Sequence, residues 1–347
     1  DGDSAFLSHH LGDLEHAEAF HAFAHATLHY RRLYRIEPRR LVHDLHPDYA
    51  STRYAQQQAL REGLSLVAVQ HHHAHLAACL AENGEQGEAI GVCFDGSGYG
   101  EDGTLWGGEF LVGGAARAIR AAHLLPVPLP GGEQAVREPW RMALAHLRAA
   151  GKPLGDLEVA RRLSAETVRA VERMLDRGFN SPLTSSMGRL FDAVAAIACA
   201  STRVSYEGQA AIRLEALAAS AAADGSYPFE LCGRAPLRID ARPAVLAAAS
   251  DARRGKGAAA IARRFHSGVV EMVAQVCARL RAATGIRTAA LSGGVFLNAI
   301  LTAEVEVRLA AEGFRVLRHR LVPPNDGGLS LGQLAVAAAR DARDREE

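Results

Sequence analysis

A continuous apolar run at residues 64–69 (LSLVAV) leads directly into a helix-forming segment that extends to about residue 82. A short apolar run of this kind is typical of a buried strand, and Asn83-Gly84 is a stop signal for the helix. The preceding residues show the same alternation, with a helix expected at 14–34, a strand at 40–46 and a helix at 51–62. This pattern predicts an α/β fold with a parallel sheet.

A second group of strands follows. We expect strands at 89–94 and 104–112, joined by a glycine-rich turn at 95–103, then a third strand at 117–124 and a proline-rich loop at 126–132. Strand–turn–strand patterning predicts an antiparallel meander that opens a second lobe. We therefore divide the chain into an α/β lobe at 1–88 and a second α/β lobe at 89–347, with a helical insertion at about 138–223.

The remainder of the second lobe combines strands and helices. A small strand pair is expected within 226–239, followed by helices at 242–253 and 258–284. A strand at 288–291 precedes a glycine pair and a helix from about Val295. A strand at 314–318 and a helix from Asp326 complete the pattern.

The composition narrows the functional classes. The 347 residues include 39 acidic and 39 basic side chains, so the balanced charge gives no bulk argument for binding nucleic acid or a membrane surface. No apolar stretch approaches the roughly 20 residues that a membrane span needs. The five scattered cysteines form no CxxC pair, and the first residues do not resemble an export signal. These features predict a cytoplasmic protein with reduced cysteines.

Four histidines within residues 71–75 are the strongest chemical signal. On a helix, residues four apart share a face, so His71 and His75 can bind one metal ion, and imidazole suits zinc or iron. His72 and His75, three apart, are an alternative pair, and a solvated or capping histidine cluster is the alternative without a metal. A zinc protease would need a glutamate directly after the first histidine, where this chain has His72.

Two aspartates could supply further ligands. Asp95 follows a buried strand, where a lone carboxylate is costly unless it is paired or metal-bound. Asp326 stands between Pro324-Asn325 and Gly327-Gly328. On sequence alone, a helix N-cap is the favoured interpretation of Asp326.

Two glycine-rich junctions could approach a phosphate. In the turn that begins at Asp95 (DGSGYG), glycines would let backbone amides contact an anion. Ser292-Gly293-Gly294 joins a strand to a helix, whose N-terminus favours negative charge. Neither matches the dinucleotide fingerprint or a P-loop, and plain turns explain both equally well.

Two helix starts carry charged residues. Arg189 and Asp192 lie three apart on one predicted helix, where a surface salt bridge is an equally good interpretation. Glu207 precedes another helix and could simply be a capping residue.

Together these pieces resemble the carboxy-terminal domain of the HypF carbamoyltransferases, which mature [NiFe] hydrogenases. The resemblance spans nearly the whole chain, with the motifs in the family's order. The matching stretches are HPDYASTRYA (46–55), VQHHHAHLAACLAENG (69–84), FDGSGYGEDGTLWGGEFL (94–111), PLPGGEQAVREPWR (128–141), SSMGRLFDAVAAI (185–197), SYEGQAA (205–211), LSGGVFLN (291–298) and VPPNDGGLSLGQ (322–333).

The resemblance implies the fold of the universal tRNA threonylcarbamoyltransferases, a two-lobed actin-like or sugar-kinase ATPase fold with the nucleotide and metal in the cleft between the lobes. It implies that the metal ligands and catalytic residues are His71, His75, Asp95 and Asp326. It also implies ATP, AMP or carbamoyl-adenylate as the bound nucleotide. The nucleotide contacts would come from Gly96, Ser97, Gly98, Gly188, Arg189, Asp192, Glu207, Gly208, Ser292, Gly293, Gly294 and Asn298.

The resemblance further implies carbamoyl transfer from carbamoyl-adenylate to the carboxy-terminal cysteine of a HypE-type protein, assisted by a divalent metal (iron, zinc or, less well, magnesium). In the family, an acylphosphatase-like domain, a zinc-finger segment and a YrdC-like domain lie upstream, and none is expected within these 347 residues. We also expect the first lobe to be truncated at its N-terminal start.

Three other functions remain open at this point. The acceptor could be a small molecule, as in an O-carbamoyltransferase, or a tRNA, although the zero net charge disfavours nucleic acid. A nucleotide-binding module without chemistry is an alternative of another class, but such a module has no use for a histidine metal site.

Overall fold

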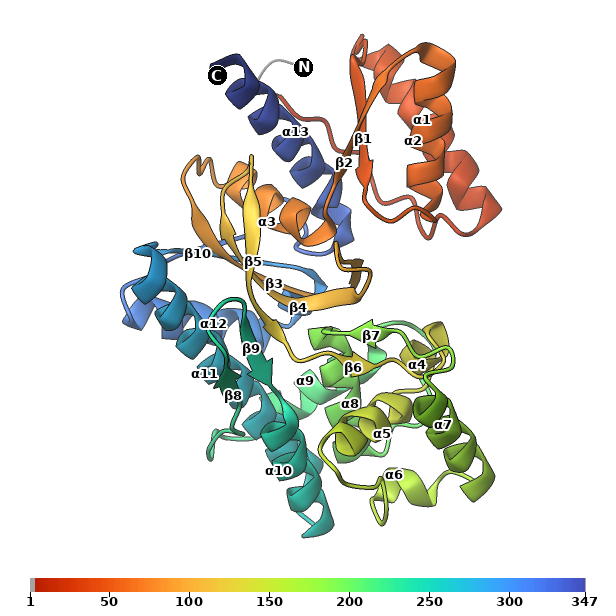
Figure 1. The fold of residues 1–347 in the computed structure, drawn as a ribbon, viewed down its shortest axis with the longest axis vertical. Helices are drawn as coiled ribbons and strands as arrows, with labels where there is room; N and C mark the ends of the chain where they lie inside the picture. Colours follow the sequence, from red (N-terminus) through yellow and green to blue (C-terminus); the bar gives the residue numbers. More distant parts are fainter. Residues whose placement is uncertain (1–3, 347) are drawn as a thin grey trace.

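The structure, a computed structural model, describes residues 4–346, and its first helices and strands agree with the predicted alternation. Helix α1 (Ala17–Leu33) precedes strand β1 (Arg40–Asp44), helix α2 (Ala50–Glu62) and strand β2 (Ser65–Val69). The two strands pair in parallel, with Asp44 opposite Val69. In Figure 1 they stand between α1 and α2 on one side and the last helix of the chain, α13 (Leu329–Glu346), on the other.

A large mixed sheet forms the centre of the molecule (Figure 1). Its main path runs β11-β10-β3-β4-β5-β9-β8, and the short strands β6 and β7 pair beside β4. The predicted antiparallel meander β3–β4–β5 is confirmed, and β10 and β11 run parallel to β3. The bounds are β3 (Ala89–Tyr99), β4 (Leu105–Gly113), β5 (Ala118–Leu124), β6 (Val127–Pro128), β7 (Leu183–Thr184), β8 (Glu230–Cys232), β9 (Leu237–Asp240), β10 (Thr288–Ser292) and β11 (Arg315–Arg318).

Strand β3 is longer than predicted. We expected it to end at Phe94, but it continues to Tyr99, with a register shift between Phe94 and Gly98. Pairing with Trp106 and Leu105 of β4 keeps residues 98–99 extended, so the turn begins only at Gly100. The shift matters because it lies beside Asp95, and irregularities of this kind often redirect side chains near functional sites.

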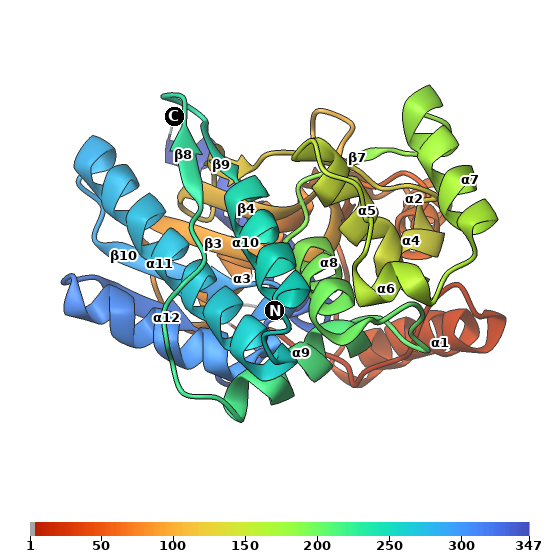
Figure 2. The same cartoon turned by 90° about the horizontal axis from the view of Figure 1, so that it is seen from below.

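Helices cover both faces of the central sheet. Helix α3 (His71–Glu82) packs on one face, where Leu76 and Leu80 meet Cys93 of β3. On the opposite face, Val92 and Phe94 of β3 join the main hydrophobic core. That core includes α8 (Met187–Cys199), α9 (Gln209–Ala219) and α11 (Ala258–Thr284), which lie in front of the sheet in the view from below (Figure 2).

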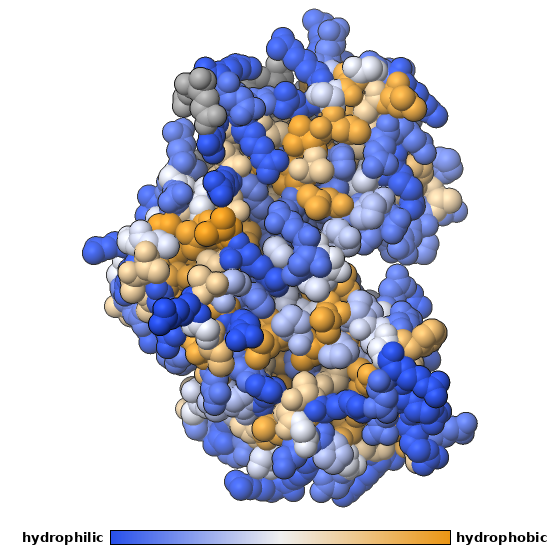
Figure 3. Space-filling model, in the orientation of Figure 1, coloured by the Kyte–Doolittle hydropathy of each residue, from blue (hydrophilic) through white to orange (hydrophobic). Residues whose placement is uncertain are grey.

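The segment at 138–223 is mainly helical, as predicted, although β7 interrupts it. The molecule is notched between the α1–α2 region and this segment (Figure 3). The proposed division of the chain at residue 88 remains a prediction. Helices α5 (Trp140–Ala149), α6 (Glu158–Arg161) and α7 (Ala165–Arg177) belong to the segment at 138–223, and α4 (Glu133–Arg137) and α10 (Arg242–Arg253) lie outside it in the sequence.

Two predicted helix starts are wrong by several residues. A 3-10 turn, η1 (Gly294–Leu297), precedes α12 (Ala299–Ala311), because the Asn298 side chain accepts a hydrogen bond from Leu301 N and caps the helix there. Likewise η2 (Asp326–Gly328) precedes α13. No helix within residues 4–346 is long and apolar enough to span a membrane.

Candidate metal and nucleotide site

The first turn of α3 presents two imidazoles to one point. Strand β2 ends at the buried Val69, and the Gln70 side chain caps α3 by accepting a hydrogen bond from His73 N at 2.9 Å. The helix therefore begins at His71, which places His71 and His75 one turn apart on the face that looks toward β3. Both histidines are buried.

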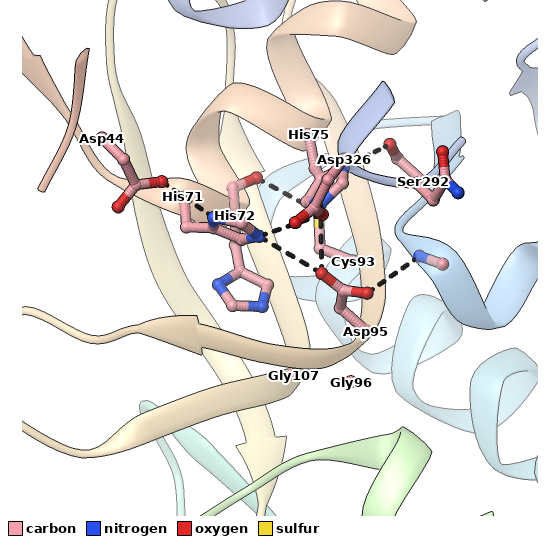
Figure 4. Close-up of polar contacts among 12 residues, drawn as sticks. Asp44, His71, His72, His75, Cys93, Asp95, Gly96, Gly107, Ser292 and Asp326 are labelled. Carbon is pink, nitrogen blue, oxygen red and sulfur yellow. Dashed lines mark hydrogen bonds and ion pairs between the residues drawn. The ribbon is translucent and has the colours of Figure 1, made fainter. Parts of the chain in front are cut away.

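Asp95 reaches the same point because side chains alternate along β3. Residues 92 and 94 enter the main core, whereas Cys93 and Asp95 face α3. Asp95 Oδ2 lies 3.2 Å from Nε2 of both His71 and His75, and Oδ1 accepts a hydrogen bond from Gly294 N at 3.1 Å. Figure 4 shows this carboxylate beneath the two rings.

Asp326 completes the cluster from the far end of the chain. Its Oδ1 lies 3.5 Å from Nε2 of both His71 and His75, and its side chain is 63% exposed, so the cluster opens to solvent on this side. The favoured sequence interpretation of Asp326 as an N-cap is wrong. The cap of η2 is Asn325, whose Oδ1 accepts a hydrogen bond from Gly327 N at 3.1 Å, whereas Asp326 Oδ1 faces the histidines.

The spacing of these four side chains suits one metal ion. One donor atom from each lies within 4.8 Å of all the others. Ligands around an ion with bonds of about 2.0–2.2 Å stand roughly 3.0–3.5 Å apart, which matches the nitrogen–oxygen separations here. Charge-assisted hydrogen bonds would be shorter, at about 2.7–2.9 Å. Two imidazoles with two carboxylates form a donor set for zinc or iron.

The electrostatics of the cluster favour charged side chains: they raise the pKa of His71 and lower the pKa of the two aspartates. Burial disfavours imidazolium, but the neighbouring carboxylates of Asp326, Asp44 and Asp95 raise the pKa of His71 well above its ordinary value. Burial opposes ionisation of Asp326 too, yet the two histidines lower its pKa to about 2. Although burial opposes ionisation of Asp95, the same two histidines hold the pKa of this group well below its ordinary value, so both carboxylates are ionised at neutral pH and available to a cation.

Sequence reasoning missed Asp44, which orients His71. Asp44 ends β1 and is buried, and its Oδ2 lies 2.8 Å from His71 Nδ1. The carboxylate accepts the Nδ1–H, so Nε2 is the nitrogen that faces the cluster and could bind an ion. An aspartate at the end of one buried strand, next to a strand that leads into histidines, is the signal that could have revealed it.

The other two histidines point elsewhere. The His72 ring packs against Gly98, where an added Cβ would lie 2.6 Å from the ring, and its Nδ1 lies 3.4 Å from the Gln70 amide nitrogen. His73 Nε2 donates to the Gly114 carbonyl oxygen at 3.0 Å. Burial lowers the pKa of both rings. The alternative pair His72 and His75 is therefore not brought together.

A cavity of about 430 Å³ adjoins the cluster and shares Asp95 and Asp326 with it. Nine of the residues expected to contact a nucleotide line this cavity: Gly96, Ser97, Gly188, Arg189, Asp192, Glu207, Gly208, Gly294 and Asn298. Further lining residues that sequence reasoning missed are Phe191, Ala211, Ile212, Glu215, Val295, Leu297 and Asn325.

Three expected nucleotide contacts lie outside this cavity. Gly98 packs on the rings of His71 and His72, as its missing Cβ allows. The Gly293 amide donates to the Pro324 carbonyl oxygen at 2.8 Å. Ser292 Oγ lies 3.4 Å from His75 Nδ1, so Ser292 contacts the cluster instead.

Arg189 and Asp192 form a buried pair at the cavity, not the surface salt bridge considered above. Arg189 Nε lies 3.0 Å from Asp192 Oδ2 as an ion pair without hydrogen-bond geometry, and within the described residues these two atoms and Arg189 Nη1 have no hydrogen-bond partner. Burial raises the pKa of Asp192 to about 6, against the attraction of Arg189. Buried polar atoms without partners are costly, which points to a polar ligand.

The cavity also has an apolar wall. Ile212 of α9 and Leu297 of η1 are 54% and 59% exposed, although large apolar side chains usually gain from burial. Their placement beside the charged pair gives the cavity one polar and one apolar side. Such pockets, typically about 300–1,000 Å³, suit small organic ligands.

Comparisons with known proteins identify related domains and chains. Residues 1–82 match the family model described as the HypF Kae1-like domain, and residues 91–333 match the carbamoyltransferase Kae1-like domain, second subdomain. Carbamoyltransferase HypF2 of Cupriavidus necator is 42% identical across 98% of this chain and 44% of its own length. A shorter HypF homolog from the same organism is 43% identical across 86% of this chain and 77% of its own length.

Solved structures share the fold. The crystal structure of full-length HypF in the phosphate- and nucleotide-bound form superposes with a TM-score of 0.89 at 36% identity, over 96% of this chain and 43% of that one. The structure of T. kodakarensis HypF gives a TM-score of 0.85 at 29% identity, over 95% and 44%. The predicted actin-like α/β fold is thus confirmed, and the chain spans less than half the length of these full-length relatives.

Proposed function

Since the chain belongs to the HypF carbamoyltransferase family, we propose that it transfers a carbamoyl group from carbamoyl-adenylate to the carboxy-terminal cysteine thiolate of a HypE-type protein. The observation that carries this proposal is the continuity of the two subsites. Asp95 and Asp326 belong both to the metal-type cluster and to the lining of the cavity. A nucleotide in the cavity would therefore present its phosphate end, and a group attached to it, to the cluster.

The cavity has the properties that an adenylate requires. Arg189 offers N–H donors to an anionic or polar group, and Asp192 offers an acceptor to a hydroxyl. The apolar wall of Ile212 and Leu297 suits the faces of an adenine ring. The nucleotide-bound relative supports a nucleotide ligand for this chain as well.

His71, His75, Asp95 and Asp326 would hold the divalent metal. When bound, the ion supplies a Lewis acid that polarises the carbamoyl carbonyl. The chain's own residues prepare this site: Asp44 holds the His71 ring, and the Gly294 amide holds the Asp95 carboxylate. The donor set favours iron or zinc, and magnesium suits it less well because magnesium prefers oxygen ligands.

In the transfer step, the acceptor sulfur forms a bond to the carbamoyl carbon. The bond between that carbon and the phosphate oxygen breaks, and its electron pair leaves with AMP. The products are an S-carbamoyl cysteine and AMP, so charge and atoms balance. The cysteines of this chain are unsuited to the role, because burial raises the pKa of Cys79 to about 12 and none of the five lines the cavity.

The supply of carbamoyl-adenylate would come from other parts of a longer protein. The full-length relatives are more than twice as long as the aligned chain. We propose that, as the family resemblance implies, acylphosphatase-like, zinc-finger and YrdC-like domains of such a protein make the adenylate that this domain consumes.

The proposal is tested with His75→Ala and Asp326→Ala, and with His73→Ala as a matched control in the same helix. We expect the first two variants to lose bound metal and to lose transfer from preformed carbamoyl-adenylate to the acceptor, while His73→Ala keeps both. Full metal content with full transfer in both cluster variants would refute the assignment.

The acceptor is tested separately by measuring AMP release. We expect release to require a HypE-type protein with its terminal cysteine intact. Equal release with a cysteine-free acceptor, a small hydroxyl compound or a tRNA would assign the domain to one of the alternative transferases.

A further inference from the structure

A chain of polar groups leads away from His75 on the side opposite the cluster. Ser292 Oγ lies 3.4 Å from His75 Nδ1 and 2.9 Å from His319 Nε2. His319 Nδ1 lies 2.9 Å from Glu82 Oε2. The side chains of His319 and Glu82 are only 3% and 5% exposed, so water competes little for these contacts.

When the His75 and His319 rings are both neutral, one assignment of protons satisfies all the contacts that link His75, Ser292, His319 and Glu82. The Glu82 carboxylate can only accept, so His319 donates through Nδ1 and accepts through Nε2. Ser292 then donates its hydroxyl proton to His319, and its oxygen accepts the Nδ1–H of His75. That arrangement leaves the lone pair of His75 on Nε2, the atom that lies 3.2 Å from Asp95.

Glu82 also fastens the loop that leads to Asp326. Its Oε1 accepts hydrogen bonds from the amides of Arg320 and Leu321 at 2.6 and 2.5 Å. These contacts tie the segment after β11 to the last turn of α3, the helix that carries the two histidines. The Glu82 carboxylate is therefore linked to two of the four cluster residues. It is linked to His75 through His319 and Ser292, and to Asp326 through the loop that it holds.

We propose that Ser292, His319 and Glu82 are positioning residues that fix the Nδ1–H tautomer of His75 and hold the Asp326 loop against α3. The inference rests on the proposed metal site. His71 receives the same support from a single group, Asp44. The two ligand imidazoles are therefore oriented differently. The Asp44 carboxylate contacts the His71 ring directly, whereas the Glu82 carboxylate acts on the His75 ring through the His319 ring and the Ser292 hydroxyl.

The test compares Ser292→Ala, His319→Phe and His319→Gln with the unaltered chain. His146→Phe is the matched control, because His146 is also buried but lies in α5, away from the cluster. The dissociation constant for Zn²⁺ is measured by competition with a chromophoric chelator. Long-range ¹H–¹⁵N spectra of the zinc-loaded chain report which nitrogen of His75 carries the proton.

We expect Ser292→Ala and His319→Phe to weaken zinc binding by about tenfold to a hundredfold, as removal of outer contacts to metal ligands commonly does. The glutamine amide offers a donor nitrogen and an acceptor oxygen, so His319→Gln should recover most of the affinity. The His146→Phe control should bind zinc as the unaltered chain does. In the unaltered chain the proton of His75 should lie on Nδ1.

Unchanged zinc affinity in both Ser292→Ala and His319→Phe would overturn the inference, as would a proton on Nε2 of His75. If His319→Gln bound zinc as poorly as His319→Phe, His319 would have a packing role only. An unaltered chain that bound no zinc or iron would instead refute the proposed metal site, so the two failures are distinguishable.

Discussion

Gly332 of α13 packs directly against Ala74 of α3. A Cβ added at Gly332 would lie 1.8 Å from the Ala74 carbonyl oxygen, so only glycine allows the two helices to approach so closely. Ala74 is flanked by His73 and His75, and Asp326 lies six residues before Gly332. This contact therefore sets how closely the Asp326 carboxylate can approach the histidines.

Replacing Gly332 with alanine should displace α13 from α3. We expect a loss of about 1–3 kcal/mol in the free energy of unfolding, as overpacking commonly costs, together with weaker metal binding. Ser330→Ala, an exposed change on the same helix, is the control. Urea unfolding and zinc competition measure the two effects, and a Gly332→Ala chain as stable as the control would contradict the packing argument.

The neighbouring histidines of α3 should respond differently to the same substitution. His71→Asn removes Nε2, which faces Asp95 and Asp326, and should abolish tight metal binding. His72→Asn should retain the metal, because the His72 ring faces Gln70 and Gly98. Metal content after gel filtration distinguishes them, and loss of metal in both variants would mean that His72 belongs to the site.

The buried carboxylate of Asp192 should make stability depend on pH. Its folded-state pKa of about 6 lies above the unfolded value of about 3.9, so the folded chain binds this proton more tightly. The wild-type chain should therefore gain stability relative to Asp192→Asn as the pH falls through 6 toward 4, by up to about 3 kcal/mol. Above pH 7 the difference should level off.

Urea unfolding of both chains at several pH values between 8 and 4 gives this difference directly. Asp48→Asn, which alters an exposed carboxylate, is the control. A difference between wild type and Asp192→Asn that stays constant over this range would show that Asp192 is not held in a desolvated environment.

Local sequence patterns predicted well those parts of the architecture that depend on residues close together in the sequence. The apolar run before α3 and the four histidines required only helical and strand periodicity. Features fixed by distant partners were missed. The length of β3 depends on pairing with Trp106, and the role of Asp44 depends on His71, 27 residues later. Ser292 was assigned to the nucleotide because nothing local shows that its hydroxyl faces α3.

No local sequence pattern revealed the exposed apolar wall of the cavity, which we expect to contact the base of a bound nucleotide. Ile212→Asn and Leu297→Asn should each weaken AMP binding by roughly fivefold to thirtyfold, since each removes about 1–2 kcal/mol of apolar contact with the base. Val307→Asn changes another exposed apolar side chain, on α12 and outside the cavity lining, and should leave the affinity unchanged. Calorimetric titration with AMP measures all three. Because neither wall residue touches the metal-type cluster, zinc affinity should stay the same throughout. Equal AMP affinity in the wall variants and the control would place the base on another side of the cavity.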